Sequence, residues 1–247
     1  MTETDATPVQ SHAFDIYEIP MSGYRLHASY FGPRDKTALL LHGGKSSSDQ
    51  IFPLRLDLAE RGIGTLAVDH LGHGRTGGAV EMSSLQGRCE EALEAIRAVD
   101  PSCLLGSVSI SMGGYVSVKL SSMIQLKALV LIAPAMYDHK AFSEPFDDRF
   151  SKVVRRDRSW EHSDAWVILE NFSGKVTVIA GKEDEVIPAE VFSKCHSFGP
   201  RDRRELVMLD GVGHTVVTSL RDGQEQRLTM VLDRIEACLA GPPAQPS

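Results

Sequence analysis

The stretch "VSISMGGY", residues 108–115, places Ser111 between an apolar run and a pair of glycines. A serine on a sharp strand-to-helix turn can act as a nucleophile, and the motif that presents it is G-x-S-x-G. Here Gly113 occupies the second glycine position of that motif, but Ser109 occupies the first. Serine adds only one hydroxyl-bearing carbon to glycine, so Ser109 alters the motif without abolishing it. The stretch therefore predicts Ser111 as a nucleophile on a modified elbow.

A serine hydroxyl is a poor nucleophile until a base removes its proton, and histidine is the usual base. The chain has nine histidines. His214 lies in "GVGH", residues 211–214, directly after the last predicted strand and in a loop lined by glycines. Such a loop can bring the imidazole to the edge of a sheet where Ser111 also lies. We therefore expect His214 to be the base.

The histidine in turn needs a carboxylate that fixes its tautomer and stabilises the imidazolium. The segment "GKEDEVIP", residues 181–188, follows a predicted strand and offers three carboxylates in a row. Asp184 lies at the centre of this turn, between Gly181 and Pro188, whereas Glu183 and Glu185 flank it. We expect Asp184 to orient His214 and the two glutamates to face solvent.

Acyl transfer also requires donors for the negative charge that develops on the carbonyl oxygen. The segment "LHGG", residues 41–44, ends a buried strand, and its glycines leave backbone N–H groups free to turn. Gly44 N–H is the expected donor from this loop. Met112 N–H is the second expected donor, because it follows the nucleophile at the start of a predicted helix whose dipole favours negative charge.

The elements that position these residues follow from the hydrophobic pattern. Two alternating segments, 14–20 and 24–31, predict an antiparallel hairpin. From residue 37 onward, short buried strands alternate with helices, and the last helix is expected over 219–240. This alternation predicts an α/β protein with a mostly parallel sheet of about eight strands and helices on both faces. The length is ordinary for a single domain over residues 1–247.

One long segment interrupts this alternation, between the strands that end near Ala135 and begin near Lys175. The stretch 163–172 is expected to be the crossover helix, which leaves about 136–162 as a small cap inserted after strand 6. Aromatic side chains of the cap either line an acyl or aryl pocket or seat the cap on the core, and a cap arginine is a candidate for binding a substrate carboxylate. The aromatic candidates are Phe142, Phe146, Phe150 and Trp160, and the first arginine candidate is Arg155.

Composition excludes several classes of partner. The formal net charge of −7 argues against nucleic acid, whose binding depends on Lys and Arg. No apolar run approaches the roughly 18 residues that span a bilayer, and the polar N-terminus is unlike a signal peptide. Four widely spaced cysteines suit reduced thiols, so a cytoplasmic location is expected. His70 and His73 form an H-x-x-H pair, but no third ligand follows closely, so neither a metal nor a cofactor is expected.

Taken together, these motifs resemble the α/β-hydrolase superfamily over about residues 25–240. "LHGG" resembles its oxyanion loop, "SISMGG" its nucleophile elbow, "GKEDEVIP" its acid loop and "GVGH" its histidine loop. "DHLGHGRT", residues 69–76, resembles its D-x-x-G-H-G-x-S loop, with Thr76 in place of the serine. The glycine pair of the elbow and the short cap resemble small carboxylesterases such as cinnamoyl and feruloyl esterases and monoglyceride lipases.

The resemblance implies hydrolysis of a small-molecule carboxylic ester or thioester through an acyl-enzyme on Ser111, by a monomer or a homodimer. Two other classes stay open. The same fold and triad serve acyl transfer, perhydrolysis and lyase chemistry, and a non-catalytic protein can keep the fold as a ligand pocket.

Overall fold

A computed structural model describes residues 14–101 and 103–240, and its core is one eight-stranded sheet in the order β1-β2-β4-β3-β5-β6-β7-β8. The pairs β1–β2 and β2–β4 are antiparallel, and all later neighbours are parallel. The predicted hairpin and the mostly parallel sheet are both present. The strands are β1 (Asp15–Met21), β2 (Tyr24–Phe31), β3 (Thr37–Leu41), β4 (Gly64–Asp69), β5 (Leu104–Ile110), β6 (Ala128–Ile132), β7 (Lys175–Gly181) and β8 (Arg204–Leu209).

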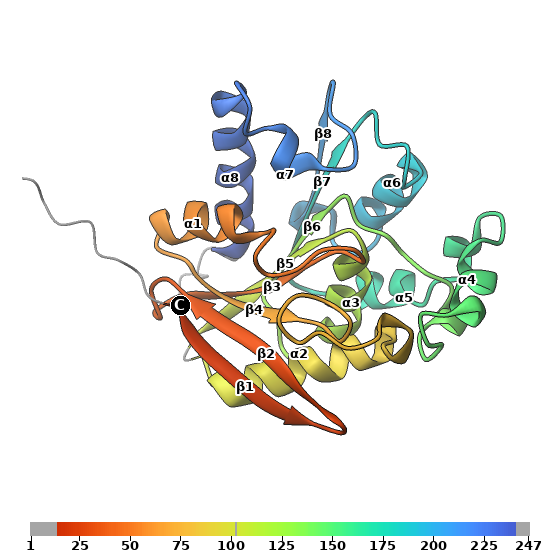
Figure 1. Cartoon of the computed structure of the whole chain (residues 1–247). Helices are drawn as coiled ribbons and strands as arrows, with labels where there is room; N and C mark the ends of the chain where they lie inside the picture. The colour runs from red at the N-terminus through yellow and green to blue at the C-terminus, as the bar shows by residue number, and fades with distance from the viewer. Residues whose placement is uncertain (1–13, 102, 241–247) are drawn as a thin grey trace, which may run out of the picture.

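Helices cover both faces of the sheet, as the alternation predicts. Figure 1 shows α1 and α8 on one side of the central strands, with α2 and α3 on the other. The α-helices are α1 (Phe52–Glu60), α2 (Leu85–Val99), α3 (Met112–Ser121), α4 (Asp148–Val154), α5 (Ala165–Asn171), α6 (Ala189–Ser197), α7 (Val216–Ser219) and α8 (Glu225–Leu239). Four short 3₁₀ turns are η1 (Val80–Met82), η2 (His139–Ala141), η3 (Ser159–His162) and η4 (Arg201–Arg203).

The sheet separates two hydrophobic cores. Successive side chains of a strand point to opposite faces, so Leu39 and Leu41 of β3 pack with α2 and α3, whereas Ala38 and Leu40 pack with α1 and α8. All five residues of β3 are buried. Burial on both faces explains why the central strands are continuous apolar runs rather than alternating ones.

The final helix differs from the prediction. Instead of one helix over 219–240, the structure has the short α7 and the longer α8 with a turn between them. Gly223 in this turn has φ +70°, a left-handed conformation that glycine adopts readily and that ends helical continuity. The short α7 begins two residues after His214, at the carboxyl edge of the sheet.

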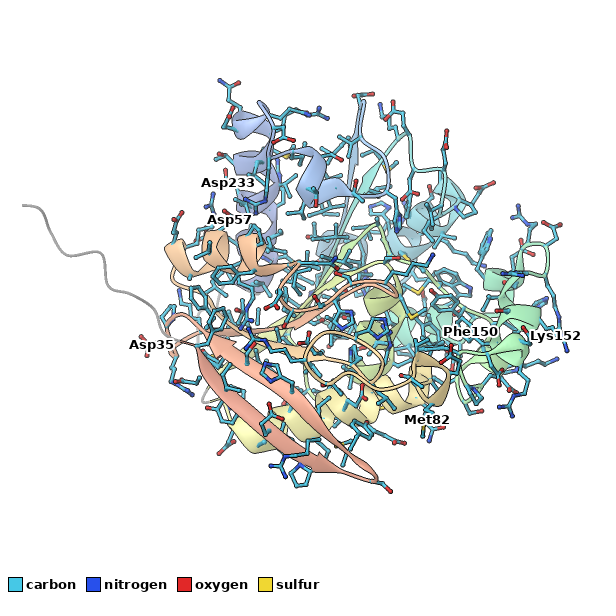
Figure 2. All side chains as sticks on the ribbon, viewed as in Figure 1. Asp35, Asp57, Met82, Phe150, Lys152 and Asp233 are labelled. Carbon is cyan, nitrogen blue, oxygen red and sulfur yellow. The ribbon has the colours of Figure 1, made fainter. Side chains whose placement is uncertain are left out.

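The insertion between β6 and β7 contains η2, α4 and η3 before α5 leads back to the sheet. It is anchored on the start of α2, because Gln86 N–H donates to Phe142 O (2.9 Å) and Phe146 N–H donates to Ser83 O (2.9 Å). Figure 2 shows Phe150 on α4 directed toward the body of the molecule and Lys152 directed outward. Phe150 is buried and Lys152 is exposed.

Within the described part of the chain, no helix has the length and apolarity needed to cross a membrane. The cysteines Cys89, Cys103, Cys195 and Cys238 are not joined in disulfides.

Candidate active site

Four loops that the sequence singles out meet at one edge of the sheet. The "LHGG" loop follows β3, the elbow follows β5, the acid loop follows β7 and the histidine loop follows β8. These strands are parallel, so their carboxyl ends lie on the same side. In open α/β sheets that edge is where ligands bind.

The elbow holds Ser111 in a strained backbone conformation, with φ 51° and ψ −117°. A positive φ is uncommon for a residue with a side chain, and such strain is found where structure serves a site. The turn is tight, because a Cβ on Gly113 would lie 2.5 Å from Leu41 O. Gly113 is therefore required for α3 to start directly beside the end of β3.

Ser109, in the other glycine position of the motif, is accommodated by burial and one hydrogen bond. Its side chain is fully buried, and its Oγ donates to Val130 O at 3.0 Å on the neighbouring strand. By alternation it points to the same face as Ser107, whose hydroxyl meets that of Ser117 on α3. The space between β5 and α3 thus admits a hydroxymethyl group.

This geometry predicts the effect of size at position 109. Ser109→Leu should lower stability by about 1–3 kcal/mol through overpacking and should reduce labelling of Ser111 by a fluorophosphonate probe. Ser109→Gly loses one hydrogen bond, costs about 1 kcal/mol and should keep activity. Thermal unfolding and probe labelling of the two variants measure both effects. A leucine variant as stable and as reactive as the wild type would contradict this explanation.

The structure brings Ser111, His214 and Asp184 together in one hydrogen-bonded chain. His214 Nε2 lies 3.0 Å from Ser111 Oγ, and His214 Nδ1 lies 2.8 Å from Asp184 Oδ2. A carboxylate only accepts, so His214 donates from Nδ1–H. Its Nε2 is then free to accept the Ser111 proton. This is the tautomer that a general base needs.

The acid loop is held rigidly around Asp184, whose side chain is 1% exposed. Asp184 Oδ1 accepts from Val186 N–H (2.8 Å) and Ile187 N–H (3.0 Å), which leaves Oδ2 for His214. Glu183 and Glu185 are both exposed, as expected. Glu183 has a further role, because its Oε2 accepts from Val212 N–H (2.9 Å) and so ties the acid loop to the histidine loop.

The segments that carry the two expected oxyanion donors both approach the elbow. A Cβ built on Gly44 would lie 3.1 Å from Met112 Cε, and a Cβ built on Gly43 would lie 3.4 Å from Ser111 Cβ. Met112 is the first residue of α3, so its N–H has no acceptor within the helix. Both N–H groups therefore belong to backbone segments that border Ser111.

Two histidines hold the carbonyls of the oxyanion loop. His42 Nδ1 donates to Gly43 O (2.7 Å), the carbonyl of the peptide that carries Gly44 N–H, and His73 Nε2 donates to Gly44 O (2.6 Å). Burial, with His70 and Arg88 nearby, holds the pKa of His42 well below its usual value, so its ring is neutral. His42 Nε2 accepts from His70 N–H at 3.3 Å, which completes the assignment of its tautomer.

His70 and His73, the H-x-x-H pair of the sequence, belong to the hydrogen-bonded network around the expected oxyanion loop. His70 Nδ1 lies 2.6 Å from Glu91 Oε2, and both side chains are buried. Arg88 is fully buried next to His73, and its Nε and Nη1 have no hydrogen-bond partner among the residues that the structure describes. Among the described residues, no three His, Cys, Asp or Glu side chains come together as a possible metal site.

A pocket of about 760 Å³ opens beside Ser111 and His214. Its walls come mainly from two segments, 43–51 after β3 and 214–218 around the start of α7. The lining residues are Gly43, Gly44, Lys45, Ser46, Gln50, Ile51, Ile110, Ser111, Met112, Ile132, Tyr137, Val186, His214, Thr215, Val216, Val217 and Thr218.

The cap contributes only Tyr137 to this lining. Phe142 faces Tyr115 (6.3 Å between centroids), Phe146 packs on Phe150 (4.8 Å), and Trp160 packs on Trp166 (6.3 Å). Arg155 is exposed and does not line the pocket either. Of the two alternatives for the aromatic residues, the structure has them seating the cap on the core. The four substrate-binding candidates Phe142, Phe146, Trp160 and Arg155 therefore lie outside the pocket.

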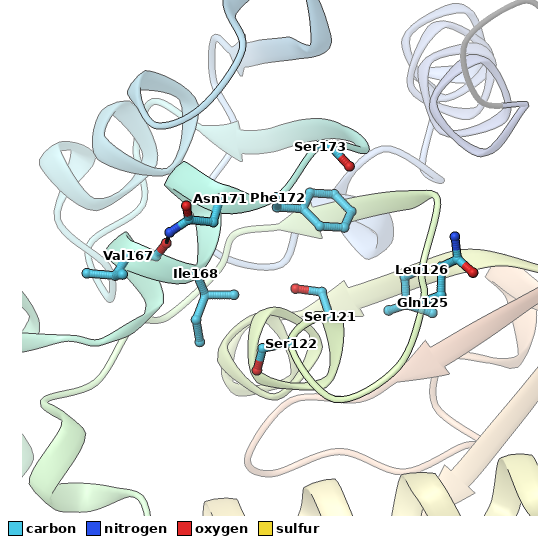
Figure 3. Close-up of a pocket in the computed structure, with 9 residues that line it drawn as sticks. All are labelled: Ser121, Ser122, Gln125, Leu126, Val167, Ile168, Asn171, Phe172 and Ser173. Atoms are coloured by element: carbon cyan, nitrogen blue, oxygen red, sulfur yellow. Dashed lines mark hydrogen bonds between the residues drawn. The ribbon is translucent and has the colours of Figure 1, made fainter.

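A second pocket, of about 360 Å³, lies between the end of α3 and α5 (Figure 3). Its lining includes Ser121, Val167 and Phe172 but no charged side chain. Ser121 ends α3, about 15 Å along the helix axis from Ser111. This pocket is therefore separate from the Ser-His-Asp chain.

Several of the lining residues that sequence reasoning missed follow an expected site residue directly along the chain. Lys45 and Ser46 follow Gly44, and Thr215, Val216 and Val217 follow His214. Their place just beyond the carboxyl ends of β3 and β8 is the signal that could have indicated them.

The fold recurs among solved structures at low sequence identity. Est1E from Butyrivibrio proteoclasticus, with ferulic acid bound, matches with a TM-score of 0.71 and 20% identity over 91% of this chain and 99% of that chain. A predicted CIB-like hydrolase from Thermoplasma acidophilum matches with a TM-score of 0.68 and 16% identity over 92% and 100%. Paleococcus ferrophilus monoacylglycerol lipase matches with a TM-score of 0.66 and 17% identity over 87% and 98%.

No curated protein matches the chain. Residues 32–161, more than half of the chain, match the family model described as "Serine aminopeptidase, S33". The match includes the oxyanion loop, the elbow and most of the cap. The chain therefore belongs to this serine aminopeptidase family of the α/β-hydrolase superfamily.

Proposed function

We propose that this protein hydrolyses a carboxylic ester, or a thioester, through an acyl-enzyme on Ser111. The observation that carries the proposal is the continuous hydrogen-bonded chain from Ser111 Oγ through His214 to Asp184. A protein that only binds a ligand has no need of a base aligned on a strained serine. The family membership supports hydrolysis as the reaction class.

In the first half of the reaction, His214 Nε2 takes the Ser111 proton as Oγ attacks the carbonyl carbon. The resulting oxyanion accepts from Gly44 N–H and Met112 N–H, and the α3 dipole favours the same charge. Asp184 stabilises the imidazolium without taking its proton. His214 then donates from Nε2 to the leaving oxygen or sulfur, and the acyl group stays on Ser111.

In the second half, His214 removes a proton from a water that attacks the acyl-enzyme. The same N–H groups hold the second oxyanion, and the acid is released as Ser111 recovers its proton. Acyl transfer and perhydrolysis differ only in the molecule that replaces water at this step. Analysis of the products distinguishes them from hydrolysis.

The lining of the pocket favours esters over peptides with a free α-amino group, which are the substrates that the family name implies. An aminopeptidase must hold an α-ammonium close to the scissile bond, and a carboxylate is the usual partner of a buried or partly buried ammonium. The residues that line the pocket include neither Asp nor Glu. They include apolar side chains such as Ile51, Val186 and Val217, which suit an alkyl or aryl group.

A substrate panel tests the proposal. We expect p-nitrophenyl acetate and butyrate to be cleaved with release of one equivalent of free acid, and an acyl thioester to be cleaved too. Leucine p-nitroanilide should react at least about 100-fold more slowly in kcat/KM, because an anilide is intrinsically less reactive than an aryl ester and because its ammonium finds no acid in the pocket. Preference for the anilide, or no acid from any ester, would overturn the proposal.

A further inference from the structure

The pocket beside Ser111 is lined by a positive charge, although the chain as a whole is negatively charged. The protein carries a formal net charge of −7, yet Lys45 is the one permanently charged side chain among the residues that line the pocket. Asp184 is not among these lining residues, and its oxygens accept from backbone N–H groups and His214 rather than from Lys45. The wall of the pocket therefore presents a positive charge without a carboxylate.

The backbone that carries Lys45 is held in place by the site itself. Lys45 follows Gly44, whose carbonyl accepts from His73 Nε2 at 2.6 Å. The preceding carbonyl, Gly43 O, accepts from His42 Nδ1 at 2.7 Å. Gly44 is also the expected oxyanion donor. The ammonium of Lys45 is thus tethered one residue from the point where the substrate carbonyl would bind.

Lys45 also has no partner within the described part of the chain. It is exposed and makes no ion pair or cation–π contact. By contrast, Lys119 pairs with Asp164 (2.7 Å), Lys182 pairs with Asp210 (2.6 Å), and Lys194 lies over the Trp166 ring at 4.7 Å. The acid nearest to Lys45 in sequence, Asp49, has Arg75 at 3.9 Å. Its ammonium is therefore available to a ligand in the pocket.

We propose that Lys45 binds an anionic group of the substrate, a carboxylate or a phosphate, so that the enzyme prefers esters with an apolar body and a negative charge near the reacting carbonyl. This inference rests on the proposed function. The apolar body would contact Ile51, Val216 and Val217. The anion can belong to the acyl group or to the alcohol or thiol, and either source presents the same chemistry to Lys45.

Two matched substrate pairs test the inference and distinguish the two sources. In the acyl pair, the mono-p-nitrophenyl ester of glutaric acid is compared with p-nitrophenyl pentanoate. In the alcohol pair, the butyrate ester of p-hydroxybenzoate is compared with that of p-hydroxybenzamide. The readout is the ratio of kcat/KM, anionic over neutral, within each pair. Each pair differs in charge and little in size, so the ratio isolates the contribution of the charge.

Lys45→Met should lower this ratio about 5-fold in at least one pair, as expected for an ion pair at a solvent-exposed rim. Lys45→Glu should lower it further, Lys45→Arg should retain most of it, and salt at about 0.5 M should reduce the wild-type ratio. Lys152→Met removes an exposed cation on α4 and should leave both ratios unchanged. The pair that responds identifies where the anion lies.

Equal ratios in wild type, Lys45→Met and Lys45→Glu for both pairs would overturn the inference and leave the proposed function intact. A wild-type protein that cleaves none of the four esters would instead overturn the proposed function, and this inference with it. Circular dichroism of the variants verifies that each is folded.

Discussion

Ser111→Ala is expected to lower kcat/KM for p-nitrophenyl butyrate by about three to six orders of magnitude relative to the wild type. The hydroxyl that His214 Nε2 approaches at 3.0 Å is then absent, so no acyl-enzyme can form. What remains is the contribution of the oxyanion donors to attack by water. Alanine keeps the Cβ of serine, so we expect the elbow and the pocket to persist.

Labelling with a fluorophosphonate probe gives an independent measurement of the same residue. Wild type should be labelled and Ser111→Ala should not. Ser193→Ala removes an exposed hydroxyl on α6, which donates to Ala189 O within its own helix, and should be labelled like wild type. Equal labelling of wild type and Ser111→Ala would show that another residue is the nucleophile.

Asp184→Asn should lower kcat by about four orders of magnitude while leaving the fold in place. Two backbone N–H groups, from Val186 and Ile187, bind Asp184 Oδ1, so the amide oxygen of asparagine would take that position. Its NH₂ group would then face His214 Nδ1 and would favour the tautomer with the proton on Nε2. In that tautomer His214 cannot accept the Ser111 proton.

Glu185→Gln is the matched control for this substitution, because Glu185 is the next carboxylate in the same loop and is exposed. Its kcat should stay within about twofold of wild type, since exposed substitutions outside the site have small effects. Steady-state kinetics of both variants measures kcat, and thermal unfolding measures their stability. An asparagine variant with more than a tenth of the wild-type kcat would assign the orienting role to another group.

The sequence patterns predicted the positions of Ser111, Asp184 and His214 because each follows a predicted strand. Parallel strands place their carboxyl ends at one edge, so residues far apart in sequence can be expected to meet there. The hydrogen bonds between them were not predictable in the same way. They depend on contacts such as Glu183 Oε2 with Val212 N–H, which join two loops that the chain pattern treats separately.

Other predictions were wrong because local patterns omit tertiary partners. The helical periodicity of 219–240 concealed a break at Gly223, whose left-handed φ lies in the turn between α7 and α8. The aromatic residues of the cap are of the type that often lines a binding pocket. Their rings nevertheless pack on one another and on the core, because Phe150, Tyr115 and Trp166 are within reach in the folded chain.

The amino-acid pattern alone indicates the α/β class, the order of nucleophile, acid and base, and the superfamily that this order resembles. These features depend on short segments whose hydrophobic period and turn residues act locally. The position of the pocket and the charge that lines it become visible in the folded chain. The pocket forms where residues 43–51 meet residues 214–218, which are distant in the chain, and the availability of Lys45 depends on which acids the fold pairs elsewhere.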